Sequence, residues 1–190
     1  MLSNEQIIEI LERTGSLKTG HFVLSSGLHS NKYVQCALAL SYPKEADRLC
    51  STLAEKLADI EIDVVVGPAM GGVVVAYELA RALGVQGIFS ERVDDRMFLR
   101  RGFEIKPGQK VLVIEDVVTT GKSAKEVMGM LAEMGAEVVA VAAIIDRSNG
   151  KADFGVPFKA LLQLDIPTFE PVRCPMCAAG TVAVKPGSRK

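Results

Sequence analysis

The segment VLVIEDVVTTGKS, residues 111–123, has the pattern of a buried strand that runs through a short loop into a helix. Its first four residues are apolar and three of them are β-branched, which is typical of a strand buried on both faces of a parallel sheet. Two acids, Glu115 and Asp116, follow at the carboxyl end of this strand. Apolar residues then recur at helical spacing until Gly135, a residue suited to a helix C-cap. The segment therefore predicts an α/β fold.

The loop between this strand and this helix has the composition of a phosphate-binding site. Thr119, Thr120 and Ser123 supply hydroxyl donors, and Gly121 lets the backbone approach a ligand closely. The start of a helix adds unpaired N–H groups and the positive end of the helix dipole. Asp116 stands where a G-x-x-x-x-G-K-S loop has its first glycine, so a nucleotide triphosphatase is disfavoured. Acids beside a phosphate need other partners, and ribose hydroxyls or a magnesium ion would serve.

This segment resembles the phosphoribosyl pyrophosphate (PRPP) motif of the type I phosphoribosyltransferases, which is an apolar strand, two acids, two apolar residues and Thr-Thr-Gly. The resemblance implies a mainly parallel central sheet flanked by helices, an N-terminal hood and Mg²⁺ as the cofactor. An ordinary strand-to-helix turn with polar capping residues is the alternative. The resemblance assigns PRPP binding to Glu115, Asp116, Val117, Val118, Thr119, Thr120, Gly121, Lys122 and Ser123.

Composition and charge exclude several classes of protein. The chain has 190 residues, 48% of them apolar and 24% charged, which fits one globular domain with its own core. A net charge of −1 gives no overall attraction to nucleic acid or to an anionic membrane. No apolar run approaches the roughly 20 residues that span a bilayer, and the N-terminus lacks the pattern of a signal peptide. The four cysteines make no evident disulfide framework, so we expect a cytoplasmic protein.

The first forty residues predict a capped helix followed by a hairpin. Ser3 and Gln6 form a capping-box pattern before a helix that Gly15 ends. Strand-like ends flank a polar turn in residues 20–35. A plain surface hairpin is one interpretation. In the other, residues 1–40 and the C-terminal segment form a hood over a core of about residues 44–165, all within a single domain of 190 residues.

The orotate branch of the family has a similar hairpin, and the resemblance implies that Ser26 contacts orotate. Ser25 stands where many members have a lysine that touches the ligand. The matching residues of this chain are Leu24, Ser26, Gly27, Ser30 and Tyr33.

A glycine-rich turn, GPAMGG at residues 67–72, lies one βα unit before the motif. A short buried strand at residues 63–66 precedes it, and a helix follows it as far as Gly84. Such a turn suits an anion, although tight packing of helix on strand also explains it. In phosphoribosyltransferases the loop at this place holds pyrophosphate, which implies that role for Ala69, Met70 and Gly71.

The most charged segment, residues 91–105, follows a third strand at residues 86–90. A solvated hairpin of mixed charge is the plain interpretation. The resemblance implies a lid that closes over PRPP and is shared between the subunits of a homodimer, with Arg92 and Arg96 as catalytic residues beside Asp116. Val93 and Phe98 stand where many orotate enzymes have a lysine and a histidine.

An arginine, Arg147, follows Asp146 at the end of another apolar strand, residues 138–145. An arginine at this place is able to pair bidentately with a carboxylate or simply to lie in solvent. The orotate enzymes have an Asp-Arg here whose arginine grips the orotate carboxylate. The resemblance therefore assigns orotate binding to Arg147, Thr119 and Ser26.

The C-terminal segment contains a lone Cys-x-x-Cys, Cys174 and Cys177, which suggests half of a zinc site. His21, His29, Cys36 and Cys50 are the remaining histidines and cysteines, and none stands at ligand spacing, so we expect no metal ligands in the protein. One subgroup of orotate enzymes ends in a segment similar to residues 174–189, so the resemblance covers nearly the whole chain.

The combined motifs resemble the orotate phosphoribosyltransferases, which make orotidine 5′-monophosphate and pyrophosphate from orotate and PRPP in pyrimidine biosynthesis. A phosphoribosyltransferase for another base needs no arginine at position 147. A PRPP-sensing regulator that binds nucleic acid is the other alternative, and it needs a DNA-binding module or a basic face. We expect small-molecule substrates, no nucleic acid, no membrane and a homodimer.

Overall fold

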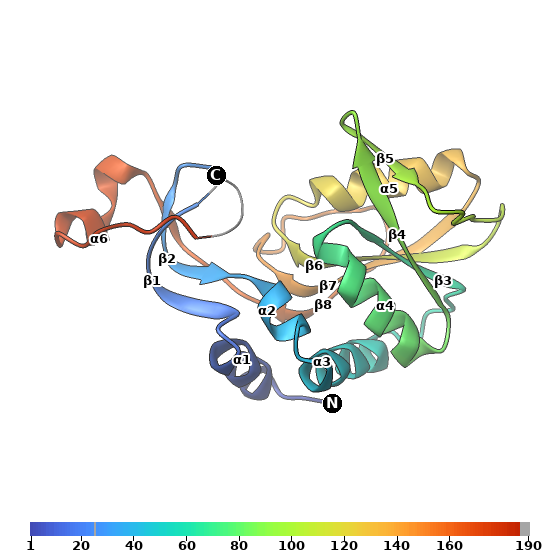
Figure 1. Cartoon of the computed structure of the whole chain (residues 1–190), viewed down its shortest axis with the longest axis horizontal. Coiled ribbons are helices and arrows are strands. Elements are labelled where there is room, and N and C mark those ends of the chain that lie inside the picture. Colours follow the sequence, from blue (N-terminus) through green and yellow to red (C-terminus); the bar gives the residue numbers. More distant parts are fainter. Residues whose placement is uncertain (25, 187–190) are drawn as a thin grey trace.

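The computed structural model describes residues 1–24 and 26–186, and its largest feature is a six-stranded sheet (Figure 1). The order of its strands is β5-β4-β3-β6-β7-β8, and every neighbouring pair is parallel except β4 with β5. The strands are β3 (Val64–Pro68), β4 (Gln86–Val93), β5 (Arg96–Leu99), β6 (Lys110–Val118), β7 (Glu137–Asp146) and β8 (Phe158–Gln163). The predicted α/β fold is confirmed, with the motif strand β6 inside the sheet.

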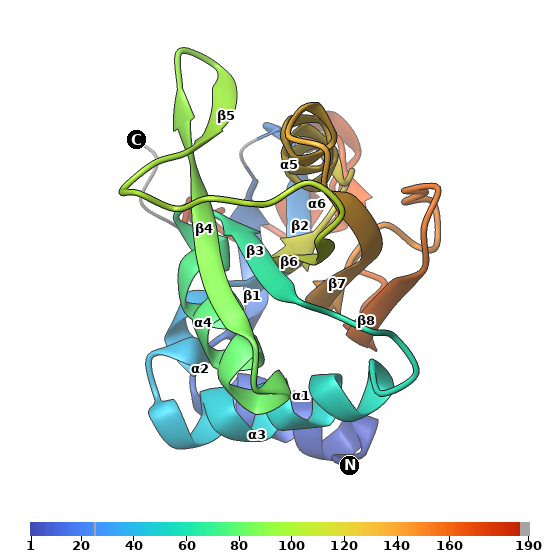
Figure 2. The same ribbon diagram turned by 90° about the vertical axis from the view of Figure 1, so that its right-hand side faces the viewer.

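Side chains of the central strands alternate between two hydrophobic cores, one on each face of the sheet. In β6, Leu112 and Ile114 belong to the first core, whereas Val111 and Val113 belong to the second. Residues of α1 (Asn4–Arg13), α2 (Cys36–Leu40), α3 (Pro43–Lys56) and α4 (Gly71–Leu83) fill the first core. Residues of α5 (Lys122–Glu133) cover the second, and Figure 2 shows α5 and α3 on opposite sides of the sheet. Burial on both faces explains the continuous apolar runs in the sequence.

A smaller sheet brings the two ends of the chain together. Its order is β1-β2-β9, where β1 is Leu17–Val23, β2 is His29–Val34 and β9 is Thr168–Phe169. The predicted hairpin is thus confirmed, with a third strand from the C-terminal segment. A 3₁₀ turn, η1 (Pro171–Arg173), and a short helix, α6 (Pro175–Ala178), follow β9, and Val184 then bridges to Phe22. Figure 1 shows β1, β2 and α6 to one side of the six-stranded sheet.

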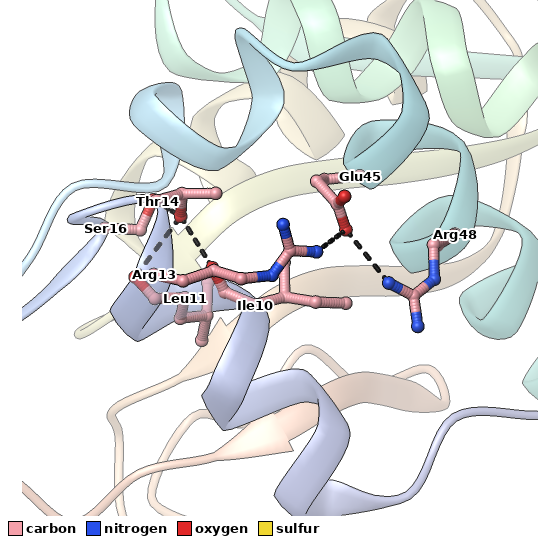
Figure 3. A network of polar contacts seen from close by, with 7 residues as sticks. All are labelled: Ile10, Leu11, Arg13, Thr14, Ser16, Glu45 and Arg48. Atoms are coloured by element: carbon pink, nitrogen blue, oxygen red, sulfur yellow. Dashed lines mark hydrogen bonds and ion pairs between the residues drawn. The ribbon is translucent and has the colours of Figure 1, made fainter.

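An ion-pair network fastens α1 to α3 beneath the smaller sheet (Figure 3). The carboxylate of Glu45, which is largely buried, accepts from Arg13 at 2.7 Å and from Arg48 at 3.2 Å. The Thr14 hydroxyl, at the end of α1, donates to the Ile10 carbonyl at 2.7 Å. At the other end of α1 the Ser3 capping box is present as predicted. These contacts hold the first helix against the core from which the smaller sheet extends.

Some elements differ from the sequence prediction. The helix α2 and the strand β9 were not predicted, because each is too short to show a period. The strand predicted at residues 86–90 is β4, and it continues to Val93. The chain then turns back through Asp94 and Asp95, which have φ of 46° and 64°. Two consecutive residues with positive φ form the turn that matches the twist of a two-residue hairpin. In the described part of the chain, no helix has both the length and the apolarity needed to cross a membrane.

Candidate active site

The loop after β6 forms a small cavity at the N-terminus of α5. Glu115 and residues 117–123 line this cavity, whose volume is about 60 Å³. Gly121 is the N-cap of α5 with a φ of 75°, and a Cβ added there would lie 2.7 Å from the Phe154 ring. Glycine at this position therefore satisfies both the backbone conformation and the packing. The residues that the sequence assigns to a phosphate loop do lie together, with the first N–H groups of a helix at their centre.

The two acids at the end of β6 are partly buried without a compensating cation. Burial raises the pKa of Glu115 from its ordinary value of 4.5 to about 8, and the charge of Asp116 adds to this rise. Burial also raises the pKa of Asp116, although the Val117 N–H donates to its Oδ1 at 2.9 Å and opposes the shift. Within residues 1–24 and 26–186 no ion pair involves either carboxylate. Such a pair favours ligands that carry hydroxyl donors or a cation.

The glycine-rich turn after β3 lies against the second acid. A Cβ added to Gly71 would lie 2.7 Å from Asp116 Oδ1, so the backbone of this turn borders the carboxylate directly. The Ala69 N–H donates to the Ser90 carbonyl of β4 at 2.7 Å, and the Ala69–Met70 peptide bond is cis. The fold thus brings the predicted pyrophosphate loop, residues 69–71, beside the acid pair of β6.

Arg147 lies at the end of β7, next to the phosphate loop. Its N–H donates to the Val118 carbonyl, the last residue of β6, at 2.8 Å. Its side-chain Nε is buried and has no hydrogen-bond partner among the residues that the structure describes. Burial lowers the pKa of Arg147, while the nearby Tyr33 phenol acts in the opposite direction. A buried guanidinium nitrogen without an acceptor marks a place where an anion would be stabilised.

Two further residues come from the turn between β1 and β2 and from α2, and only the first of them was predicted. Ser26 lies in the exposed turn of the hairpin, where its hydroxyl accepts from the Leu28 N–H at 3.4 Å. Within residues 1–24 and 26–186 no hydrogen bond joins Ser26 to Arg147, and Ser25 lies outside the described residues. The Sγ of Cys36, at the start of α2, lies 3.7 Å from the carbonyl oxygen of Asp116. The sequence carries no signal for this contact, because α2 has neither a motif nor a clear period.

The arginines of the predicted lid are not brought to the phosphate loop in this structure. They lie on the β4–β5 hairpin, which contacts α5. Arg92 forms an ion pair with Glu126 on the first turns of α5, and its Nη1 donates to the Asp95 carbonyl at 3.1 Å. Arg96 lies 3.8 Å from Glu133, farther along the same helix. The hairpin is therefore a folded part of the sheet whose cations are held by acids of α5.

Comparison with known proteins agrees with this geometry. Residues 41–165 match the model of the phosphoribosyl transferase domain family. The chain is 59% identical to the orotate phosphoribosyltransferase of Carboxydothermus hydrogenoformans, over 92% of this chain and 93% of that protein. It is 54% identical to the orotate phosphoribosyltransferase of Caldicellulosiruptor bescii over the full length of both chains.

Solved structures of similar shape include two of a Mycobacterium tuberculosis enzyme. The complex of that orotate phosphoribosyltransferase with inorganic phosphate has a TM-score of 0.71 and 30% identity, over 85% of this chain and 95% of that chain. The complex of the same enzyme with PRPP has a TM-score of 0.67 and 30% identity, over 83% and 96% of the two chains. The overall fold of this chain is thus similar to that of an enzyme solved in complex with inorganic phosphate and with PRPP.

Proposed function

Because the chain belongs to the orotate phosphoribosyltransferase family, we propose that the loop, the acid pair and Arg147 described above form its substrate site. The enzyme transfers the ribose 5-phosphate group of PRPP to orotate and gives orotidine 5′-monophosphate and pyrophosphate, a step of pyrimidine nucleotide biosynthesis. The observation that carries the site assignment is the alignment of three neighbouring strand ends, which carry the phosphate loop, the two acids and Arg147, whose buried Nε has no acceptor in the described structure. Open α/β sheets bind ligands at this carboxyl edge.

The loop from Thr119 to Ser123 holds the 5′-phosphate in this proposal. The free N–H groups at the start of α5 and the helix dipole favour an anion, and the loop hydroxyls add donors. Gly121 supports this role because it adopts the left-handed conformation at the start of α5 and packs closely against the Phe154 ring, which together set the path of the loop.

Glu115 and Asp116 hold the ribose hydroxyls. Because its pKa is about 8, Glu115 keeps a proton at neutral pH, and it is able both to donate to and to accept from a hydroxyl. Its neutral form also lowers the repulsion between the acid pair and the phosphates of PRPP. The carboxylates of Glu115 and Asp116 are oxygen ligands that would suit Mg²⁺ brought in with the substrate. Bound Mg²⁺ would supply charge neutralisation on the leaving pyrophosphate.

Arg147 selects the base. Its Nε lacks an acceptor in the described structure, and the orotate carboxylate is an acceptor that guanidinium pairs with bidentately. A nucleobase without a carboxylate would leave this buried cation unpaired. Thr119 and Ser26 complete the base site from the loop and the hairpin. The geometry thus favours orotate over adenine, hypoxanthine or uracil.

Carbon 1 of the ribose gains positive charge as pyrophosphate departs, and the orotate nitrogen attacks it directly. Catalysis rests on positioning the reactants and on stabilising the charge of the leaving group. Residues 69–71 receive the pyrophosphate beside Asp116, while Arg92 and Arg96 neutralise it when the β4–β5 hairpin moves from α5. Closure of the hairpin also keeps water away from PRPP.

A homodimer would bring the lid of one subunit to the site of the other. An exposed apolar stripe on α4 supports such an interface, since Met70, Val74 and Tyr77 recur at helical spacing and are 86%, 48% and 68% exposed. A second copy of the chain is the expected partner of this stripe. We also place the enzyme in the cytoplasm, because its four cysteines are free thiols in the structure.

A spectrophotometric assay tests the proposal. Purified protein, Mg²⁺, PRPP and orotate are mixed, and the orotate absorbance is followed. We expect the orotate absorbance to decline only when PRPP is present. Adenine, hypoxanthine and uracil, supplied in place of orotate, should not be consumed. Consumption of another base at a higher kcat/KM than orotate would refute the role of Arg147. A shift of labelled nucleic acid with no turnover would favour a PRPP-sensing regulator.

A further inference from the structure

Four metal-ligand side chains, none of them among the residues assigned to the substrate site, meet at the smaller sheet. His21 comes from β1, His29 from β2, Cys174 is the N-cap of α6 and Cys177 lies within that helix. One ligand atom from each of the four lies within 4.8 Å of every other. Three of the residues are buried and Cys177 is exposed. The prediction from sequence that the Cys-x-x-Cys has no partner ligands was wrong, because the β1–β2 hairpin places both histidines beside it.

The separations match those of a tetrahedral zinc site. Zinc binds histidine nitrogen at about 2.0–2.1 Å and cysteine sulfur at about 2.3 Å, so ligand atoms at the corners of a tetrahedron lie roughly 3.4–3.8 Å apart. Here the Nε2 of His21 is 3.6 Å from Cys174 Sγ and 3.7 Å from Cys177 Sγ. The Nδ1 of His29 is 3.3 Å from Cys177 Sγ. The two histidine nitrogens are closer, at 2.7 Å, so a metal would move them apart by less than one ångström.

A supporting hydrogen bond orients His21 for this task. Its Nδ1 lies 2.9 Å from the Thr181 hydroxyl and 3.1 Å from the Thr181 carbonyl. A carbonyl only accepts, so this contact places the ring proton on Nδ1 and leaves the Nε2 lone pair free to bind a metal. The Thr181 hydroxyl in turn donates to the Met176 carbonyl at 2.8 Å. The segment that carries both cysteines therefore also fixes the tautomer of the histidine.

The position of the cluster gives it a structural task. The C-terminal segment joins the smaller sheet through the two residue pairs of β9 with β2 and through hydrogen bonds of Val184 with β1. Helix α6 has four residues and no buried residue of its own, so apolar packing contributes little to hold it. A metal bound by His21, His29, Cys174 and Cys177 would link both strands of the hairpin to this segment.

We propose that His21, His29, Cys174 and Cys177 form a structural Zn²⁺ site of the Cys₂His₂ type that fastens the C-terminal segment to the hairpin. Four protein ligands close the coordination sphere, so this site stabilises the fold and leaves no open position for catalysis. Binding removes the proton from each thiol and requires both histidines to be neutral, so zinc affinity falls as the pH is lowered. The site is independent of the orotate reaction.

Metal analysis of the full-length protein tests this proposal. The protein is purified in reductant, without a histidine tag, and zinc is measured by mass spectrometry. We expect one zinc per chain. After removal of the metal, titration with Co²⁺ alone is expected to give the visible absorption of a tetrahedral cobalt–thiolate centre. Hydrogen exchange of residues 168–186 is expected to speed up in the metal-free protein, with the six-stranded sheet unchanged.

Two cysteine variants provide the matched comparison. Cys177→Ala removes a ligand at an exposed position, whereas Cys50→Ala removes a fully buried thiol of the first core. Zinc affinity is expected to fall in Cys177→Ala by more than the roughly 10–100-fold caused by removing a ligand's hydrogen-bond partner. Cys50→Ala is expected to keep its zinc, although it disturbs packing more.

Three results would overturn the proposal, and all are read without the enzyme assay. They are a reduced wild-type protein that binds no zinc or cobalt, a Cys177→Ala protein that keeps one zinc per chain, and a Cys174–Cys177 disulfide in the purified protein. A wild-type protein that binds zinc but does not consume orotate would contradict the proposed substrate site and would leave the zinc site standing.

Discussion

At the scale of single residues, Arg147 is the side chain on which base selection depends. Its backbone is held by the end of β6, whereas its Nε has no acceptor. A half-buried cation whose Nε is shielded from water has already lost part of its hydration, so it stabilises a carboxylate more strongly than an exposed arginine would.

We therefore predict that Arg147→Ala weakens orotate far more than PRPP. Loss of one partner from a buried charge pair costs about 2–5 kcal/mol, which corresponds to a rise of roughly 30-fold or more in the KM for orotate. Steady-state kinetics with each substrate varied in turn measures the two effects. Arg147→Lys keeps the positive charge but loses the planar guanidinium that pairs bidentately with a carboxylate. Its KM for orotate should lie between those of the wild type and Arg147→Ala. An equal loss for orotate and PRPP would contradict the assignment.

Glu115 gives a second prediction at this scale, because its pKa is about 8 in the folded protein and 4.5 is its ordinary value. Between these values the folded protein keeps a proton that the unfolded chain has released. The unfolded state then binds fewer protons, so the free energy of unfolding falls as the pH rises from about 4.5 to 8. The change is on the order of a few kcal/mol.

Urea unfolding of the ligand-free protein across this pH range measures the effect. Glu115→Gln, which cannot ionise, should lack this part of the pH dependence and be the more stable protein at pH 8. A wild-type protein and a Glu115→Gln variant with parallel pH profiles would show that Glu115 is ionised throughout. The pKa of Asp116 is also raised, so some dependence should remain in the variant.

At the scale of elements, the site is built from strand ends and helix starts. β3, β6 and β7 are parallel neighbours, so the loop or residue that follows each lies at the same edge of the sheet. The β4–β5 hairpin differs from them, since its two-residue turn projects beyond this edge and its arginines pair with α5 (Figure 1).

The hairpin leads to a prediction about Arg92 and its partner Glu126. Arg92→Ala should lower kcat by about 10²-fold, because it removes a charge that stabilises the departing pyrophosphate. Glu126→Gln, which only releases Arg92 from α5, should keep a kcat close to the wild type. Circular dichroism would show that both variants are folded. Wild-type turnover in Arg92→Ala would remove this arginine from the mechanism.

At the scale of the whole molecule, the apolar stripe on α4 lies next to the substrate site through Met70, its N-cap. An interface on this stripe would place a second subunit close to the pyrophosphate loop. The lid of that subunit would then have a short path to the site, which is the arrangement that the proposed dimer requires.

We predict that Tyr77→Glu converts a dimer into monomers, since it places a charge in the middle of an apolar contact. Light scattering coupled to gel filtration measures the mass. Val172→Glu is the matched control, because Val172 is 87% exposed but lies on η1, away from α4. A Tyr77→Glu protein with the mass of a dimer would place the interface elsewhere, and a monomeric wild type would refute the shared lid.

Much of the fold and part of the candidate site can be predicted from the local pattern of the sequence. The β6 segment, its loop and α5 follow from apolar runs, turn residues and a helical period, all within one continuous stretch, residues 110–133. Arg147 is recognisable because it follows a strand that is as clear as β6. Position relative to a sheet edge is a local property of each βα unit, so the residues of the phosphate loop, the acid pair and Arg147 lie at the strand ends where local reasoning places them.

Contacts between distant segments are beyond such reasoning. His21 and Cys174 are 153 residues apart in the chain, and their spacing alone predicts no metal site. Glu126 holds Arg92, and Cys36 touches Asp116, only because packing brings their elements together. The sequence therefore determines which segments become strands, helices and ligand loops, since these depend on neighbouring residues. Folding in three dimensions determines which loops share a site, because chain connectivity sets no distance between residues far apart in sequence.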